Sequence, residues 1–418
     1  MKLRVAIVVW DLSVSGGTQR QALELAQQLL DSGVSVDIYC QVLDHKLCYP
    51  KLTKNLHIVS PAKIAGAQVL NSQRALIRLR LANTGIFRLL DVDYWSYHTR
   101  DGQVRQLADL MGHENYDVVN AHDSPAHKVI ALYKKRHPES KTVWMSNDMP
   151  WIFQFLEQYR APKGEQHLMY WLSSLFLRYE KMRESKVANK INEIVVLDNR
   201  NKKLFQKFLH RTPKVVRSGL DTKHFYPVLK KNNRIFTILA TGIFFRYRRF
   251  EDLIKAVGML KQKGLKLKLN IIGSDQFDPG YGKELAAQVK RLKLSNEVSF
   301  LGRVSEEDLL DNYKGADVFV FPNHNQTWGL APFEAMASGT PVIVSRTAGA
   351  HEVLSDGKNA LLINPLEPRD IADKLELLYN DGELRQQLAK QGLSYVNKNM
   401  SWQLYAKNML KVFKELTG

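Results

Sequence analysis

The sequence has few cysteines, an excess of bases over acids, and no long apolar run. Its two cysteines, Cys40 and Cys48, lack the paired spacing of a metal site and predict a reducing, cytoplasmic setting. No apolar run reaches the roughly 18 residues that a membrane span needs, so no membrane-spanning helix is predicted. The apolar stretch 3–10 is short and is followed by Asp11. We interpret it as a first strand rather than a secretory core.

Acidic residues are outnumbered, with 42 Asp and Glu against 60 Lys and Arg, and the net charge is +18. Such a chain is either a soluble protein with many surface lysines or a binder of an anionic membrane, substrate or nucleic acid. Zinc-finger, basic-zipper and RNA-recognition signatures are missing, which argues against nucleic acid. The segment from Arg74 to Leu90 has four arginines and no acid. It predicts either peripheral attachment to an anionic membrane surface or packing on the domain.

The length of 418 residues suits two domains, and 44% hydrophobic residues suit packed cores. Both halves alternate apolar strand patterns with helical patterns, the clearest helices being 18–30 and 250–263. This alternation predicts an α/β fold with two doubly wound, Rossmann-like parallel sheets. The predicted strands are 5–10, 36–39, 56–59, 118–121, 142–145 and 193–197 in the first half, and 235–240, 267–272, 298–301, 318–321 and 342–344 in the second.

The most informative stretch runs from Phe321 to Ser345. It predicts a buried strand, a loop that holds Gly329 and Leu330, a short helix that carries Glu334, and a further strand. A glycine-containing loop that leads into a helix presents free backbone N–H groups, which suit a phosphate. Glu334 can accept hydrogen bonds from sugar hydroxyls. Together these features suit a nucleoside diphosphate with its ribose.

This stretch resembles the nucleotide-recognition segment of the GT-B-fold retaining glycosyltransferases of group 1, also called glycosyltransferase family 4. Members show two Glu residues separated by seven others, with Phe-Gly-Leu between them and Glu-Ala-Met-Ala-x-Gly-x-Pro-Val at the end. Here Glu334 matches the second Glu, Trp328 stands for the Phe, and Gln326 replaces the first Glu. Gln cannot hold a negative charge near the reacting sugar. The resemblance is strong after Pro213 and loose over 45–116.

The resemblance also implies roles for residues elsewhere in the chain. Gly16 and Gly17, between the first strand and helix, match a loop that lies against the donor phosphates or the acceptor. His122 follows a predicted strand, at the edge where ligands bind in this fold, and matches a His that contacts the donor sugar. The resemblance thus implies a catalytic group of His122, Gln326 and Glu334.

The loop after residue 240 carries three arginines in four residues, which suit a diphosphate. The family has Gly-Arg, four residues, then Lys-Gly at this point. Arg248 takes the usual Lys position, whereas Ile243 takes the usual Arg position, so Arg246 is the candidate replacement. Val304 matches a site where backbone groups contact the base. The donor-binding set is therefore Gly16, Gly17, Arg246, Arg248, Val304, Gly329, Leu330 and Glu334.

The implied activity is transfer of a sugar from a nucleoside diphosphate-sugar to a hydroxyl acceptor, such as a lipid-linked or cell-envelope glycan, with retention of configuration. No metal or other cofactor is expected, because cationic side chains take that part in the GT-B architecture. The competing interpretations are a nucleotide-sugar epimerase of the same architecture and a non-catalytic basic binding protein. Loss of a carboxylate at Gln326 argues against the epimerase, which needs acid–base carboxylates.

The resemblance also implies the domain organisation. Residues 1–218 are expected to form the acceptor-side domain, completed by a crossing helix at 401–418. Residues 219–400 are expected to form the donor-binding domain. The boundary is expected near the segment 217–227, which is similar to the family's interdomain stretch.

Overall fold

The structure is a computed structural model that describes residues 3–14, 16–61, 101–147, 168–227, 235–276, 278–326 and 328–418. The segment from Arg74 to Leu90 lies outside these residues. The chain divides into two compact units. Unit 1 comprises Met1–Val216 and Ala406–Gly418, and unit 2 comprises Arg217–Tyr405. No helix within the described ranges is long and apolar enough to cross a membrane.

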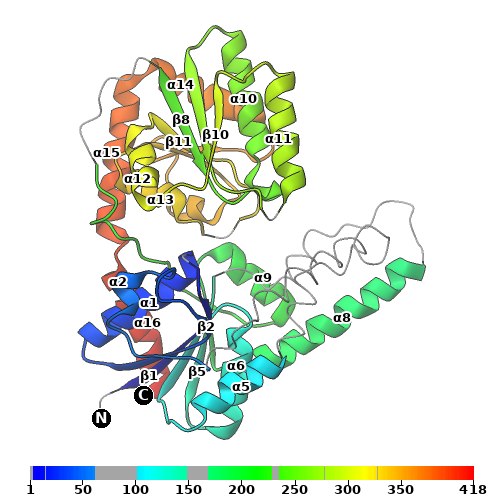
Figure 1. Cartoon of the computed structure of the whole chain (residues 1–418), viewed down its shortest axis with the longest axis vertical. Helices are drawn as coiled ribbons and strands as arrows, with labels where there is room; N and C mark the ends of the chain where they lie inside the picture. Colours follow the sequence, from blue (N-terminus) through cyan, green and yellow to red (C-terminus); the bar gives the residue numbers. More distant parts are fainter. Residues whose placement is uncertain are drawn as a thin grey trace. The chain divides into compact units, whose positions relative to one another are not determined.

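Unit 1 is built on a parallel sheet whose strand order, among the described residues, is β3-β2-β1-β4-β5-β6-β7. Figure 1 shows α1 and α16 on one face of this sheet and α5 and α6 on the other. The strands are β1 (Arg4–Leu12), β2 (Ser35–Leu43), β3 (Ile58–Val59), β4 (Val118–His122), β5 (Lys141–Ser146), β6 (Glu193–Val196) and β7 (Lys214–Val215). The helices are α1 (Gly17–Asp31), α2 (Pro50–Thr53), α5 (Asp101–Met111), α6 (Ala126–Arg136), α8 (Leu168–Ala188), α9 (Asn199–Leu209) and α16 (Trp402–Thr417).

Unit 2 is also built on a parallel sheet, with the strand order β10-β9-β8-β11-β12-β13. Helices α10 and α11 cover one face and α12 and α13 the other (Figure 1). The strands are β8 (Phe236–Thr241), β9 (Leu267–Ile272), β10 (Val298–Gly302), β11 (Val318–Phe321), β12 (Val342–Ser345) and β13 (Leu361–Ile363). The helices are α10 (Phe250–Gln262), α11 (Pro279–Arg291), α12 (Glu306–Gly315), α13 (Ala331–Ala337), α14 (Pro368–Asn380) and α15 (Gly382–Asn399), with short 3₁₀ turns η2 (Arg246–Arg248) and η3 (Gly349–Val353).

The central strands are buried on both faces, which is why they appear in the sequence as continuous apolar runs rather than alternating ones. Five consecutive residues of β1, from Val5 to Val9, are each at most 1% exposed. In each sheet the strand order reverses once, between β1 and β4 in unit 1 and between β8 and β11 in unit 2. Ligands of open α/β sheets bind outside the carboxyl ends of the strands at such a point.

The predicted doubly wound fold is confirmed, with all paired strands parallel in both sheets. Two short strands were not predicted. These are β7, which has two residues, and β13, which has three, and both are too short to show a periodicity. Helix α12 is capped by Ser305, whose hydroxyl accepts from the Asp308 N–H at 3.0 Å.

Most of helix α16 belongs to unit 1, because this unit includes the C-terminal segment Ala406–Gly418. Met409, Val412 and Phe413 are buried. Lys214 of β7 donates a hydrogen bond to Glu415 at 2.5 Å. The resemblance implies a crossing helix at 401–418, and α16 begins at Trp402.

We expect Phe413→Ala to lower the free energy of unfolding by about 3–5 kcal/mol, because it removes a fully buried ring from a packed core. Urea denaturation measures this loss. Leu404→Ala is the matched control on the same helix, because Leu404 is 36% exposed, and it should cost far less. Equal losses for the two variants would show that α16 does not complete a core through Phe413.

Candidate active site

In unit 2, two side chains meet across the point where the strand order reverses. Arg248 follows β8 and Gln326 follows β11, and the Arg248 Nη1 donates to the Gln326 Oε1 at 3.0 Å. The amide oxygen of Asn323, which is 1% exposed, accepts from the same Nη1 at 2.8 Å. The guanidinium carbon of Arg248 lies 6.0 Å from the ring centroid of Phe321. A positive charge is therefore held at the carboxyl edge of the sheet by neutral partners.

Glycine makes room for this arginine. A Cβ built on Gly242 would lie 2.8 Å from the Arg248 guanidinium carbon, and Gly242 has a φ of +148°. A Cβ on Gly273 would overlap the carbonyl oxygen of Gly242. The ends of β8 and β9 therefore approach each other in a way that only glycine allows.

The three arginines of this loop have different partners. Arg246 is exposed and forms two hydrogen bonds to Glu284 of α11, at 2.7 and 2.8 Å, which raise the pKa of Arg246. Arg249 pairs with Glu251 at 2.7 Å and with Asp252 at 2.8 Å. Two of the three charges are therefore engaged by carboxylates. The structure brings Arg248, but not Arg246, against Gln326.

Glu334 lies in the first turn of α13 and is half-buried. Its Oε2 accepts a hydrogen bond from the hydroxyl of Tyr313, at 2.9 Å, and that hydroxyl lies 3.4 Å from the Thr241 Oγ1. Tyr313 also lies within the electrostatic field of Arg248. Glu334 is thus connected to the end of β8, the strand that precedes the Arg248 loop.

The loop before α13 has the glycine that the sequence indicated. Gly329 has a φ of +72°, and a Cβ on it would lie 2.7 Å from the Cζ of Phe321. Leu330 is the N-cap residue of α13. Trp328, which replaces the family's Phe, is 1% exposed and stacks on Phe333 with ring centroids 4.9 Å apart. Val304 follows the last strand residue, Gly302, by two positions and is half-buried.

In unit 1, polar side chains also meet at the reversal point. Gly16 is the N-cap residue of α1 and Gly17 is its first residue. The next residue, Thr18, donates its hydroxyl to Asp123 at 2.6 Å, which connects α1 with the end of β4. Asp123 also accepts from the Asn147 N–H at 2.8 Å, just after β5.

His122 is the last residue of β4 and is 1% exposed. Because the Asn120 amide donates to the Val143 carbonyl, its Oδ1 accepts, so the His122 Nε2 is the donor of their 3.0 Å hydrogen bond. Burial lowers the pKa of His122 to about 3, so its imidazole is neutral at pH 7. His122 lies at the end of β4, where a ligand would bind, but other residues cover its side chain.

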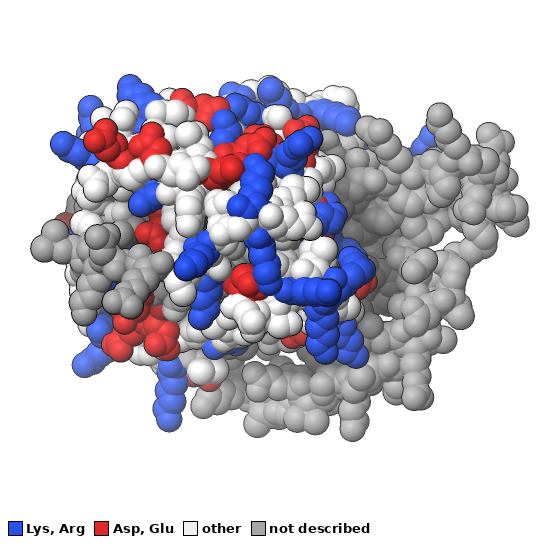
Figure 2. Space-filling view, turned by 90° about the horizontal axis from the view of Figure 1, so that it is seen from above, with Lys and Arg blue, Asp and Glu red and all other residues white. Residues whose placement is uncertain are grey.

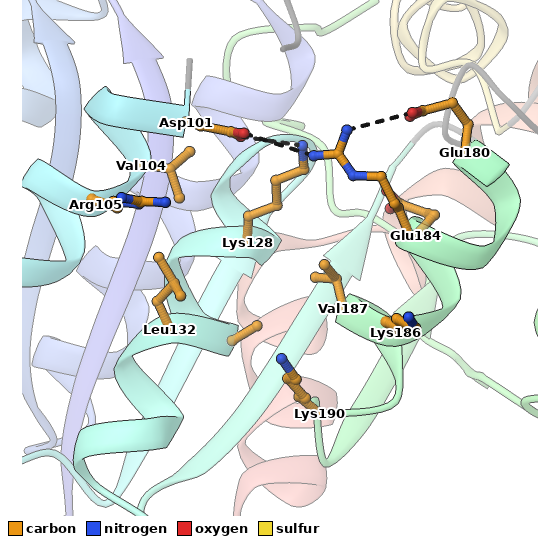
Figure 3. A pocket seen from close by; sticks show the side chains of 12 residues that line it. Asp101, Val104, Arg105, Lys128, Leu132, Glu180, Glu184, Lys186, Val187 and Lys190 are labelled. Carbon is orange, nitrogen blue, oxygen red and sulfur yellow. Dashed lines mark hydrogen bonds and ion pairs between the residues drawn. The ribbon is translucent and has the colours of Figure 1, made fainter. Parts of the chain in front are cut away.

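A cavity of about 290 Å³ lies elsewhere in unit 1, between α5, α6 and α8. Figure 3 shows Lys128 directed toward Asp101. Arg183 pairs with Asp101 at 3.7 Å and with Glu180 at 3.4 Å. None of the predicted site residues lines this cavity. His127 is fully buried beside it, 2.8 Å from Glu184 and stacked on Trp144. These contacts are those of a structural histidine.

Sequence reasoning missed Tyr313, Thr241 and Gly242 as members of the site. Tyr313 lies in α12, outside every motif, and nothing in its local sequence distinguishes it from a core tyrosine. Gly242 had a signal, because it directly follows the strand that ends at Thr241. No group of three His, Cys, Asp or Glu side chains able to hold a metal occurs in the part of the chain that the structure describes.

Comparison with known proteins gives two family matches. The model of Glycosyltransferase Family 4 matches residues 15–224, about half of the chain. The model of Glycosyl transferases group 1 matches residues 222–394, which include the Arg248, Gln326 and Glu334 cluster. Together the two matches extend over nearly all of both units.

Relatives and solved structures agree with these matches. The chain is 21% identical to mannosylfructose-phosphate synthase of Agrobacterium fabrum, over 96% of this chain and 87% of that protein. It is 28% identical to D-inositol 3-phosphate glycosyltransferase of Paenarthrobacter aurescens, over 47% of this chain and 50% of that protein. The fold is similar to that of HepE of Anabaena in complex with UDP and glucose, with a TM-score of 0.73, 15% identity, and 98% and 99% of the two chains covered.

We expect Gly329→Ala to lower the stability of unit 2 through overlap with Phe321. Gly357→Ala is the matched control, since Gly357 has a φ of +73° but a Cβ built on it would have no atom within 4 Å. Both variants carry the backbone strain, so the difference in unfolding free energy isolates the overlap, at about 1–3 kcal/mol. Equal losses would show that the Phe321 ring moves aside without cost.

We expect the stability of the protein to depend on pH through His122. The pKa of His122 in the folded protein, about 3, lies below that of an unfolded histidine. The contribution of His122 to the free energy of unfolding is therefore complete above pH ~6.5 and is lost as pH falls toward ~3. Denaturant unfolding between pH ~4.5 and ~6.5 gives the slope of the unfolding free energy against pH. This slope should be smaller by up to ~1.4 kcal/mol per pH unit in His122→Gln than in the wild-type protein. An unchanged slope in His122→Gln would contradict this account.

Proposed function

The chain belongs to Glycosyltransferase Family 4, and from this premise we propose that it moves a sugar from a nucleoside diphosphate-sugar to a hydroxyl acceptor with retention of configuration. The observation that carries the proposal is the cluster in unit 2. There Arg248 and Gln326 meet at the carboxyl edge of the sheet, where the strand order reverses between β8 and β11, and Glu334 is connected to the end of β8 through Tyr313. The similar fold of HepE, which was solved in complex with UDP and glucose, supports the same donor class.

In this proposal Arg248 binds the diphosphate. Its guanidinium is permanently charged, half-buried, and held by amides rather than by a carboxylate. An anion therefore does not have to displace an ion pair in order to reach it. Glu334 accepts hydrogen bonds from the ribose hydroxyls, and the loop at Gly329 and Leu330 presents backbone groups to the phosphates.

The chemistry that this site supports breaks the bond between the sugar C1 and the diphosphate oxygen, with the electron pair leaving on the diphosphate. The acceptor oxygen forms the new bond to C1 on the same face, and its proton passes to a departing phosphate oxygen. Arg248 stabilises the charge that develops on the leaving group. Gln326 orients a sugar hydroxyl without adding a negative charge. This scheme requires no metal, and we expect a chelator to leave the rate unchanged.

For the acceptor we propose a lipid-linked or cell-envelope glycan, reached at an anionic membrane surface through the segment from Arg74 to Leu90. The net charge of +18 supports this attraction. Figure 2 shows one face of the molecule on which Lys and Arg are interspersed with Asp and Glu. Attraction to a membrane would therefore have to come from another part of the surface.

The alternative enzyme is a nucleotide-sugar epimerase of the same architecture. An epimerase must deprotonate and reprotonate or eliminate at the sugar, which needs carboxylates directed at the ring. At position 326 the structure has an amide that already accepts a hydrogen bond from Arg248. The site therefore favours group transfer.

We expect one of a panel of UDP-, GDP- and ADP-sugars to release its nucleoside diphosphate, also in the presence of EDTA. Arg248→Ala should reduce kcat/KM by about 100-fold or more, because it removes an ionic contact used in both ground and transition states. Glu334→Ala should mainly raise KM. Arg246→Ala should cost less than Arg248→Ala, since Glu284 already engages Arg246.

The exposed Arg369→Ala, on α14, is the control for loss of a surface charge. If the wild-type protein releases no nucleoside diphosphate from any sugar of the panel and binds nucleic acid tightly, the non-catalytic interpretation is favoured. Full activity of Arg248→Ala would leave the family assignment intact but remove this arginine from the donor site.

A further inference from the structure

We propose that Tyr313 is a positioning residue that fixes the carboxylate of Glu334 for donor binding. The inference rests on the proposed function, because it concerns the carboxylate that would hold the ribose. Tyr313 lies near the end of α12, whereas Glu334 lies in the first turn of α13. The hydrogen bond between them, at 2.9 Å, connects these two helices.

The direction of this hydrogen bond follows from the chemistry of the two groups. A carboxylate can only accept, so the phenol hydroxyl is the donor. Its oxygen can then accept from the Thr241 hydroxyl, which lies 3.4 Å away. The resulting series runs from the end of β8 through the phenol of Tyr313 to the Oε2 of Glu334. Desolvation raises the pKa of Tyr313 well above its usual value, so the donor proton stays in place.

The ring of Tyr313 is held on several sides and cannot follow a displaced carboxylate. Tyr313 is fully buried. Its ring packs edge-on against Phe225, with centroids 6.0 Å apart, and lies tilted against Phe319, with centroids 5.6 Å apart. Its backbone carbonyl accepts from the Thr340 Oγ1 at 2.6 Å. A rigid donor of this kind selects one rotamer of a half-buried glutamate.

The expected effect is on binding rather than on turnover. A ribose contact is made equally in the ground and transition states, so weakening it raises KM and leaves kcat unchanged. The hydroxyl of Tyr313 touches neither the diphosphate nor the reacting carbon in this account. A purely structural role would instead reduce the amount of folded protein and leave the KM of the remainder unchanged.

The test compares Tyr313→Phe with the wild-type protein in binding UDP, GDP and ADP by calorimetry, and in KM and kcat for the active donor. We expect Kd and KM for the preferred nucleotide to rise about tenfold, as for loss of one hydrogen bond to a charged group, with kcat within about twofold. Tyr133→Phe is the matched control. Tyr133 is also fully buried, and its hydroxyl donates to the Glu114 carbonyl at 2.8 Å, in unit 1.

A double-mutant cycle shows whether Tyr313 acts through Glu334. On the Glu334→Ala background, Tyr313→Phe should change nucleotide binding by less than about twofold. A full effect of Tyr313→Phe on that background, or an unchanged Kd in the single variant, would overturn the inference while the proposed function stands. If the wild-type protein binds none of the three nucleotides, both fail, because Tyr313 then has no ribose-binding carboxylate to position.

Discussion

The close approach of two backbones, at Gly242 after β8 and Gly273 after β9, is the constraint on which the carboxyl edge of the unit 2 sheet depends. Side chains at either position would collide with the opposite strand or with Arg248. Since both glycines lack a Cβ, the Arg248 side chain can lie over the sheet edge and meet Gln326. The Arg248 guanidinium is thus held by packing and by hydrogen bonds to neutral groups.

The charges around this edge are distributed unevenly, and that distribution supports the proposed chemistry. Arg246 and Arg249 are engaged by acids on α10 and α11, which stabilise the helices that carry the loop. Arg248 has amide partners. If Gln326 were the usual Glu, that side chain could form an ion pair with Arg248. The substitution therefore leaves more of the positive potential for a diphosphate.

The fold followed from the sequence because buried parallel strands give continuous apolar runs, and these marked each strand that has four or more residues. The site was partly predictable. Gly329 and Glu334 belong to one local motif, and Gly329 indeed needs a positive φ beside Phe321. Tyr313 could not have been predicted, because its role depends on a contact between two helices. The pairing of Arg246 with Glu284 was hidden for the same reason.

The central claim is that unit 2 binds a nucleoside diphosphate-sugar at the edge formed by the loops after β8, β10 and β11. Amide hydrogen exchange, measured with and without the preferred nucleotide, tests this most directly. We predict slowed exchange at 242–249, 303–305 and 328–335, with little change at the α5, α6 and α8 cavity of unit 1. Protection confined to that cavity, with none at the three loops, would contradict the account.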